Sequence, residues 1–537
     1  MRFPAKEGLL VALSASGVRA VNNGLARTPQ MGWNNWNTFA CSVSSTLLTN
    51  TAKLLTEYGL QDLGYKYVVL DDCWSSGRDA EGKLVADTTK FPDGMGAVAD
   101  ELHEQGFLFG MYSSAGEMTC ARYAGSLDYE ENDAQSFADW GVDYLKYDNC
   151  YHMGRFGTPL ISFNRFNEMA KALKKTGRSI LYSLCSWGED YVHTVSLSPP
   201  PVLAFVTRRT VRECKTKKEE EKEGETANFF VASQWGGSIA NSWRISGDIY
   251  DSFARPDDLC SCTNAADPAC IAPGTHCSVL AIINKVAPYI DRGLPGGWND
   301  LDMLEVGHGG MTEEEYKAHF SMWAALKSPL LLGNDLRKLT ASSLAIINNP
   351  AIIALNQDPR GRAVQRISRD LDVPKDRHGV GETHVWSGPL ANGDQVVILL
   401  NAADADLDMT VSLDDVFIMD GVGTAPQVKQ DWAIHDLWGS SGSRMSSHDA
   451  QALLDAKDAD ARRSLLQTKL DWYNATELPY AQGLSRRDPR LFGERIGAVE
   501  AGGSISVRVP RHAAKVFRLQ STSGEDTTRK SLLKDEL

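Results

Sequence analysis

The chain has 537 residues, with 55 basic and 69 acidic side chains and a formal net charge of −14. Its length suits a large domain followed by a second one. The acidic balance excludes a general nucleic-acid binder, which needs a basic face for phosphates. Hydrophobic residues make up 42% of the chain, enough for a sizeable core. No apolar run approaches the ~18 residues that span a bilayer, so no membrane partner is expected.

Residues 1–20 resemble a weak secretory signal peptide with cleavage near Ala20, a frayed polar terminus being the alternative. None of the ten cysteines lies beyond Cys277, and an oxidising compartment agrees with the signal. Asn474-Ala475-Thr476 is a sequon for one N-glycan. The last residues, Lys534-Asp535-Glu536-Leu537, match an endoplasmic-reticulum retention signal, with chance occurrence in a polar tail as the alternative. The sequence thus predicts a secretory-pathway product, secreted or retained in the lumen.

Short apolar segments alternate with amphipathic ones over the first part of the chain, which predicts α/β architecture with a (β/α)8 TIM barrel over residues 21–355. A doubly wound sheet gives a similar pattern. The expected strands are Met31–Asn34, Tyr67–Asp71, Phe107–Tyr112, Tyr144–Asp148, Ile180–Ser183, Ser242–Ile245, Gly297–Asp300 and Leu330–Gly333. The expected helices include Ser45–Leu60, Ala97–Gln105, Glu131–Trp140, Ile161–Lys175 and Thr312–Lys327.

The pattern changes to period-two strands over residues 356–520, which predicts a C-terminal antiparallel β-sandwich with an internal insertion. Its expected strands are His384–Ser387, Gln395–Asn401, Met409–Leu413, Ser504–Val509 and Ala514–Leu519. Between them Ser446–Leu470 is predicted to form one polar helix. Residues 521–537 have the composition of a flexible tail.

Residues 195–234 form an atypical insertion in the barrel region, rich in charge and without helix or strand period. We interpret the segment as a translated intron. Val195-Ser196 can be encoded by GTGAGT, a common splice donor, and Gln234 by CAG, a common acceptor. The alternative is a long surface loop, which barrel rims tolerate.

Acidic residues follow four of the predicted barrel strands. Asp71 and Asp72 follow the second, Asp148 the fourth, Asp248 the sixth, and Asp300 with Asp302 the seventh. One such aspartate is most often a helix N-cap, but four strands ending this way favour a carboxylate-lined pocket at the catalytic rim of a barrel.

Two carboxylates facing one pocket suit glycoside hydrolysis. Lys146 is expected to keep Asp148 ionised through its positive charge, and Trp36 to supply an apolar wall. Phosphate-loop, zinc-protease and serine-hydrolase motifs are absent from the sequence, and we expect neither cofactor nor metal. The expected partner is a carbohydrate substrate, while the oligomeric state stays open.

Five motifs, in order along the chain, resemble the glycoside hydrolase family 27 α-galactosidases (melibiases), fungal type. They are Leu25–Asn37, Leu70–Trp74, Lys146–Cys150, Ser242–Arg244 with Asp248, and Gly297–Met303. The resemblance implies a retaining exo-glycosidase that hydrolyses terminal non-reducing α-D-galactosyl residues from galacto-oligosaccharides, galactomannans or galactoconjugates by double displacement.

By position, the resemblance makes Asp148 the nucleophile and Asp248 the acid/base, with Arg244 orienting the sugar. It implies a galactose site built from Trp36, Asp71, Asp72, Tyr112, Lys146, Ser186, Arg244 and Asp302, in which the Asp71–Asp72 pair holds the 4- and 6-hydroxyls. It also implies disulfides Cys41–Cys73 and Cys120–Cys150, with Cys185 free. Three pairings stay open among Cys260, Cys262, Cys270 and Cys277.

Ser186 departs from the family pattern, because many relatives carry Glu near the sugar's 2-position. A smaller side chain leaves room for an α-N-acetylgalactosaminidase on the same scaffold, which is the alternative activity. A non-catalytic galactose-binding barrel is the alternative from another class, and it is disfavoured because both Asp148 and Asp248 are present.

Overall fold

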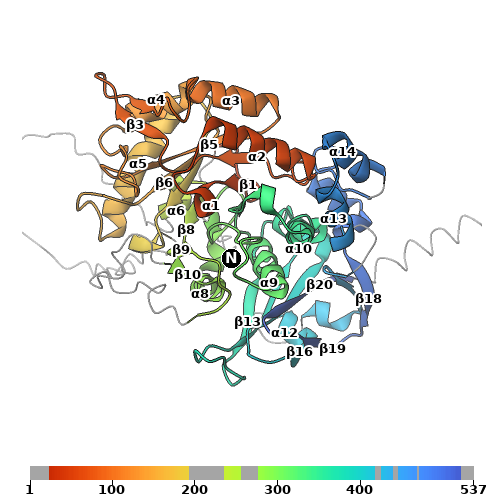
Figure 1. Cartoon of the computed structure of the whole chain (residues 1–537). Coiled ribbons are helices and arrows are strands. Elements are labelled where there is room, and N and C mark those ends of the chain that lie inside the picture. Colours follow the sequence, from red (N-terminus) through yellow and green to blue (C-terminus); the bar gives the residue numbers. More distant parts are fainter. Residues whose placement is uncertain are drawn as a thin grey trace, which may run out of the picture.

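The computed structural model of the chain describes residues 23–192, 235–255, 276–417, 425–439, 445–468 and 471–521. The proposed signal peptide, the insertion at 195–234, the cysteines at 260, 262 and 270, and the C-terminal tail lie outside the described residues. Two units follow one another along the chain, a parallel barrel and an antiparallel sheet domain (Figure 1). Both architectures confirm the predicted fold class.

The first unit is a curved sheet of eight parallel strands in the order β11-β8-β7-β6-β5-β2-β1-β12. Each strand is short and nearly all of its residues are buried, as expected for strands covered on both faces. The strands are β1 Met31–Asn34, β2 Tyr67–Val69, β5 Leu108–Ser114, β6 Tyr144–Asp148, β7 Leu181–Cys185, β8 Ser242–Arg244, β11 Trp298–Asp300 and β12 Leu330–Leu332.

The sheet closes on itself through the segment that follows β11. Leu304 bridges Leu332 in parallel, and its backbone N–H donates to the Leu331 carbonyl at 2.7 Å. The ring therefore has the topology of a (β/α)8 barrel, and all strand carboxyl ends meet at one rim. Two small sheets decorate this unit: β3 Ser75–Arg78 with β4 Leu84–Ala86, and β9 Asp248–Ile249 with β10 His276–Cys277.

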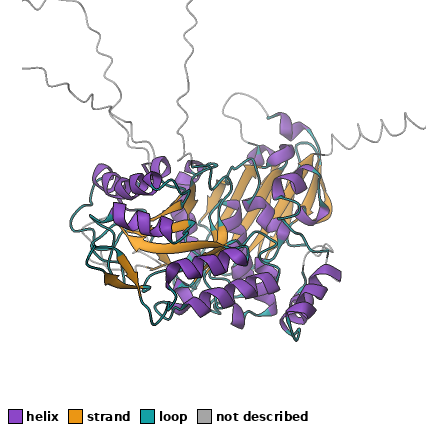
Figure 2. Ribbon diagram, turned by 90° about the horizontal axis from the view of Figure 1, so that it is seen from above, coloured by secondary structure: helices purple, strands orange, loops and turns teal. Residues whose placement is uncertain are grey.

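Helices cover the outside of the barrel (Figure 2). Their N-termini carry the capping residues that the sequence offers: Ser44, Thr158 and Thr312 each accept a backbone N–H, and Thr312 forms a capping box with Glu315. The helices are α1 Trp36–Phe39, α2 Ser45–Glu57, α3 Gly94–Glu104, α4 Glu130–Asp139, α5 Pro159–Lys175, α6 Trp235–Ile239, α8 Val279–Val286, α9 Glu313–Ala325, α10 Ala341–Ile347 and α11 Pro350–Asn356.

The second unit holds a six-stranded antiparallel sheet, β13-β14-β15-β20-β17-β18, and a two-stranded sheet, β16-β19. They enclose a core of their own that includes Val397, Leu399, Val411, Trp432 and Phe517. The strands are β13 Gln365–Asp370, β14 Thr383–Pro389, β15 Gln395–Asn401, β16 Leu407–Ser412, β17 Trp432–Asp436, β18 Glu494–Val499, β19 Ser504–Val509 and β20 Ala513–Ser521.

The predicted single helix over Ser446–Leu470 is wrong. The structure has two helices there, α13 Ser447–Leu454 and α14 Ala459–Thr468. Asp458 breaks the run because its carboxylate accepts the backbone N–H of Ala461 at 2.8 Å, which starts a new helix. The remaining helices of this unit are α12 Leu413–Val416 and α15 Tyr480–Ser485.

Disulfides join Cys41 to Cys73 and Cys120 to Cys150, the two pairs implied by the resemblance. Cys277 is also disulfide-bonded, and Cys185 is a buried free thiol. None of the helices in the described ranges is both long and apolar enough to cross a membrane.

Candidate active site

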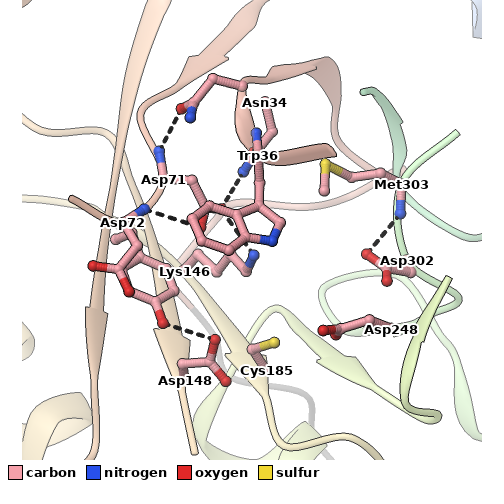
Figure 3. Close-up of polar contacts among 12 residues, drawn as sticks. Asn34, Trp36, Asp71, Asp72, Lys146, Asp148, Cys185, Asp248, Asp302 and Met303 are labelled. Atoms are coloured by element: carbon pink, nitrogen blue, oxygen red, sulfur yellow. Dashed lines mark hydrogen bonds and ion pairs between the residues drawn. The ribbon is translucent and has the colours of Figure 1, made fainter. Parts of the chain in front are cut away.

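The predicted site residues come together at the carboxyl-terminal rim of the barrel (Figure 3). Parallel strands end at one edge, so side chains that follow different strands meet there although they are far apart in sequence. The strands and the loops after them supply Trp36 after β1, Asp71 and Asp72 after β2, Tyr112 on β5, Lys146 and Asp148 on β6, Cys185 on β7, Arg244 on β8, Asp248 on β9, and Asp302 after β11.

Asp148 ends β6 and is only 5% exposed. Its Oδ2 accepts the Tyr112 hydroxyl at 2.9 Å, and its Oδ1 accepts the backbone N–H of Asn149 at 2.8 Å. Burial raises the pKa of Asp148 to about 6, although the charge of Lys146 pulls that pKa down. The expected effect of Lys146 is present, but burial outweighs it.

Asp248 sits on the other side of the rim, and its side chain is 36% exposed. In Figure 3, Asp148 and Asp248 lie on either side of Cys185. The Arg244 guanidinium reaches Asp248 Oδ1 at 3.1 Å and Asp302 Oδ2 at 2.8 Å through the same Nη2. A two-residue pairing of Asp248–Ile249 with His276–Cys277 holds the backbone of the loop.

Asp302 is fixed before any ligand arrives. Its φ of 78° is the left-handed region that non-glycine residues seldom adopt. Its Oδ1 accepts the Met303 backbone N–H, and its Oδ2 accepts that of Ile249, both at 2.8 Å. Its own N–H donates to Asp300 Oδ1 at 2.8 Å. These contacts compensate the backbone strain and aim Asp302 at Arg244.

Asp71 and Asp72 accept hydrogen bonds from different kinds of donor. Asp71 Oδ2 accepts Lys146 Nζ at 2.8 Å and Asn34 Nδ2 at 2.7 Å. Asp72 accepts backbone N–H groups at both oxygens, from Cys73 at 2.7 Å and from Ala121 at 2.9 Å. Burial raises the pKa of Asp72, and the charge of Asp71 adds to that rise.

Ser186 is buried after β7, and its hydroxyl donates to the Arg244 carbonyl at 3.4 Å. Two further side chains belong here: Asn34, which the sequence reasoning left out, and Asp300, which it counted among the rim carboxylates but not in the galactose site. Asn34 binds Asp71, and it stands inside the opening motif beside Trp36. Asp300 supports Asp302, and burial raises the pKa of Asp300 to about 6. Its place at the end of β11 was the available signal.

A small cavity is lined by some of these groups, so Lys146 and Arg244 share one space with Asp300 and Asp302. Its walls are Asn34, Tyr144, Lys146, Ser183, Cys185, Arg244, Asp300, Asp302, Met303 and Leu331. A larger cavity of about 470 Å³ lies between α2 and α14. None of the described barrel strands ends at this cavity. The size of a cavity alone therefore does not identify the active site.

One group of potential metal ligands occurs within the described ranges: Cys120, Asp148 and Cys150. Both sulfurs belong to the Cys120–Cys150 disulfide, so the group offers a single carboxylate and no metal site.

Two carboxyl groups at one barrel rim, here Asp148 and Asp248, with hydroxyl, amide and cationic side chains around them, suit the cleavage of glycosidic bonds. The fold and the site therefore place the protein among the glycoside hydrolases.

Comparisons with known proteins narrow this class. The family model described as alpha galactosidase A matches residues 28–198 and 208–358, and the alpha galactosidase C-terminal beta sandwich domain matches residues 380–463. The chain is 47% identical to alpha-galactosidase 6 of Saccharomyces cerevisiae over 518 residues, 96% of this chain and 99% of that protein. It is 49% identical to the alpha-galactosidase of Saccharomyces mikatae, over 93% and 94% of the two chains.

A solved structure of α-galactosidase from Saccharomyces cerevisiae matches with a TM-score of 0.80 and 46% identity, covering 94% of this chain and all of that one. A structure of α-galactosidase from Saccharomyces cerevisiae with raffinose also matches with a TM-score of 0.80 and 46% identity, over 93% of this chain and 99% of that one. The chain belongs to the α-galactosidase (melibiase) family, as the sequence motifs predict.

Proposed function

We propose that this chain is a retaining α-galactosidase that works by double displacement. Asp148 attacks the anomeric carbon and forms a glycosyl ester, while Asp248 protonates the departing oxygen. Asp248 then removes a proton from the water that hydrolyses the ester, and the galactose leaves with its configuration retained. The observation that carries this proposal is the placement of two carboxyl groups on either side of Cys185 at the barrel rim, Asp148 at the end of β6 and Asp248 at the start of β9 (Figure 3).

The proposed substrates carry a terminal non-reducing α-D-galactosyl residue, in galacto-oligosaccharides, galactomannans or galactoconjugates. The raffinose complex of the yeast relative supports a carbohydrate of this kind. Asp71 and Lys146, 2.8 Å apart, present an acceptor and a donor to sugar hydroxyls. Trp36 offers an aromatic face beside them (Figure 3), the usual contact for the apolar side of a pyranose.

Release of nitrophenol from its α-galactoside and its α-N-acetylgalactosaminide, measured side by side, tests the proposal. We expect turnover of the galactoside, and NMR should detect the α-anomer of galactose first. Exclusive turnover of the acetamido sugar would replace this substrate assignment with the alternative activity. An initial β-anomer would exclude the retaining mechanism.

We also propose that residues 195–234, which lie outside the described residues, are no part of the working enzyme. The described residues on either side of this segment support the proposal. The backbone N–H of Gly236 donates to the Val192 carbonyl at 3.2 Å, and Trp235 Nε1 donates to the Asp190 carbonyl at 3.0 Å. If residues 195–234 are removed, Gly236 becomes the fourth residue after Val192. A bond from residue i+4 to residue i is the bond that defines an α-helix.

The chain without the segment would therefore start α6 one turn earlier, with no change in the position of Trp235 against Phe166. This matters because α6 leads directly into β8 and Arg244. We expect a deletion that joins Thr194 to Trp235 to be at least as active as the full chain and to melt higher. A matched control that keeps Gln234 shifts the register by one residue, about 100° of helix rotation, and should melt lower. Loss of activity in the first deletion, or a major transcript that retains these codons, would overturn the proposal.

We propose that the protein is made in the secretory pathway, because two disulfides join described residues and such bonds persist in oxidising compartments. Asn474 is partly exposed at the edge of the cavity between α2 and α14, and thus open to glycosylation. Cell fractionation checks the location. For the glycan, the protein should lose mass on glycosidase treatment, and Asn474→Gln should lack that shift. Retention through the C-terminal tetrapeptide predicts release into the medium when Leu537 is deleted.

A further inference from the structure

The side chain of Asn149, directly after Asp148, connects two opposite charges. Its Nδ2 donates to Glu189 Oε2 at 2.7 Å, and its Oδ1 accepts from Arg165 Nη2. Its backbone N–H donates to Asp148 Oδ1 at 2.8 Å. One buried residue therefore holds the carboxylate of the proposed nucleophile and is itself tied to α5 and to the loop after β7.

The polarity of the amide matches its two neighbours. The oxygen faces the guanidinium of Arg165, and the nitrogen faces the carboxylate of Glu189. The other donors of Arg165 reach backbone carbonyls, those of Arg155 and Ala115, each at 2.8 Å. Glu189 is thus the anionic group that the buried guanidinium reaches through the amide.

Burial shifts the pKa values of both charged groups. It lowers the pKa of Arg165 to about 10, and it raises the pKa of Glu189 to about 7, where the adjacent Asp190 adds to the rise. Charged groups in such surroundings depend on well-oriented partners, because water does not compensate for a lost hydrogen bond. A side chain of the wrong polarity at position 149 therefore costs far more here than on the surface.

We propose that Asn149 and Glu189 are positioning residues for Asp148. The bridge Arg165–Asn149–Glu189 fixes the loop after β6 against the loop after β7, and through the Asn149 backbone N–H it sets the direction of the attacking oxygen. The inference rests on the role proposed for Asp148. Neither side chain takes part in bond making, so their loss should lower kcat and leave KM nearly unchanged.

A polarity swap tests the bridge. Asn149→Asp places a second carboxylate against Glu189, and we expect kcat to fall about 100-fold, the scale of a misplaced reacting group. Adding Glu189→Gln supplies an amide donor to the new carboxylate, which still accepts from Arg165. The double variant should regain at least about tenfold in kcat over Asn149→Asp. As a matched control, Glu168→Gln on the exposed face of α5 should give no recovery in the Asn149→Asp background.

A double variant no more active than Asn149→Asp, with both proteins folded by melting temperature, would overturn the proposal. If Asn149→Asp does not fold, a comparison of kcat between Glu189→Ala and Glu189→Gln tests the proposal instead. We expect about a tenfold loss of kcat for the alanine variant and less than about threefold for the glutamine variant, because the latter retains an oxygen acceptor. Wild-type kcat in Glu189→Ala would equally overturn it. Recovery in the double variant together with a covalent label away from Asp148 would instead remove the proposed role of Asp148 and leave the bridge intact.

Discussion

The two carboxyl groups proposed to be catalytic are supported in contrasting ways. Asp148 ends a central barrel strand, is 5% exposed, and binds one donor from β5 and one from its own loop. Asp248 belongs to a two-residue strand in a loop, and its side chain is 36% exposed. Its side-chain ion pair is with Arg244, whose Nη2 also binds Asp302.

This contrast suits the two roles. A nucleophile must approach one carbon along one line, so a rigid, desolvated setting favours it. An acid/base must exchange protons with the leaving group and then with water, so it needs access to solvent. The nucleophile side should therefore be sensitive to changes within the barrel, and the acid/base side to changes in the Arg244–Asp302 pair.

The largest expected effect is at Asp148. Asp148→Asn should abolish turnover, with kcat down by more than about 10⁴-fold, because an amide cannot form the glycosyl ester. Activity near that of the wild type would exclude the proposed role.

The same variant should unfold at a higher temperature at pH 7. The folded-state pKa of Asp148 is raised to about 6, so the folded protein binds this proton more tightly than the unfolded chain does. Stability is therefore lost as pH rises through about 6, and the ionised carboxylate costs on the order of 3 kcal/mol above it. Calorimetry should find the gain of Asp148→Asn at pH 7 and no gain at pH 4. An equal gain at both values would contradict this account.

The next effect concerns the acid/base side. Arg244→Lys keeps the charge but loses the planar guanidinium whose Nη2 contacts both Asp248 and Asp302. We expect kcat/KM on nitrophenyl α-galactoside to fall about 100-fold. Asp302→Asn, which retains an acceptor for Arg244, should lose less. Arg244→Lys with more than a third of wild-type activity would show that the guanidinium does not position Asp248.

A smaller effect should appear in the pH profile. If Asp148 is the nucleophile, as proposed, its ionised form attacks, and kcat/KM should fall tenfold per unit as pH drops below about 6. The Tyr112 hydroxyl donates to this carboxylate and lowers its pKa. In Tyr112→Phe the acid limb should move to higher pH, and a move to lower pH would contradict the assignment.

The smallest effect is expected at Cys185. Its thiol lies 3.6 Å from Arg244 Nη1, and burial raises its pKa. Cys185→Ser should change kcat/KM by less than about threefold, since the proposed chemistry uses no thiol, and the wild-type thiol should react slowly with alkylating reagents. A loss above tenfold would require a catalytic part for Cys185.

Much of the barrel could be predicted from the sequence, because buried parallel strands are short apolar runs and several end in aspartate. The observed β1 and β6 have the predicted bounds. In the second unit the sequence reasoning missed β13, β17 and β18. Most residues of β13 and β18 are exposed, so the apolar alternation of a half-buried strand is lacking there. The break at Asp458 was missed because a polar capping residue does not stand out from the polar residues around it in the sequence.

The site residues were predictable by type and order, but their support was not. The bridge through Asn149 joins residues 40 positions apart, and only the fold brings Glu189 to it. The shift of the Asp148 pKa likewise depends on burial, which outweighs the visible charge of Lys146. Neighbouring charges can be read from a sequence, whereas desolvation depends on the packed structure.

Trapping of the covalent intermediate tests the central claim most directly. The wild-type enzyme should be inactivated by a 2-deoxy-2-fluoro galactosyl donor with a good leaving group, digested with a protease, and its labelled peptide sequenced by mass spectrometry. The account predicts one galactosyl label, on the carboxylate of Asp148, and no label in Asp148→Asn. A label on Asp248, or on any residue other than Asp148, would contradict it.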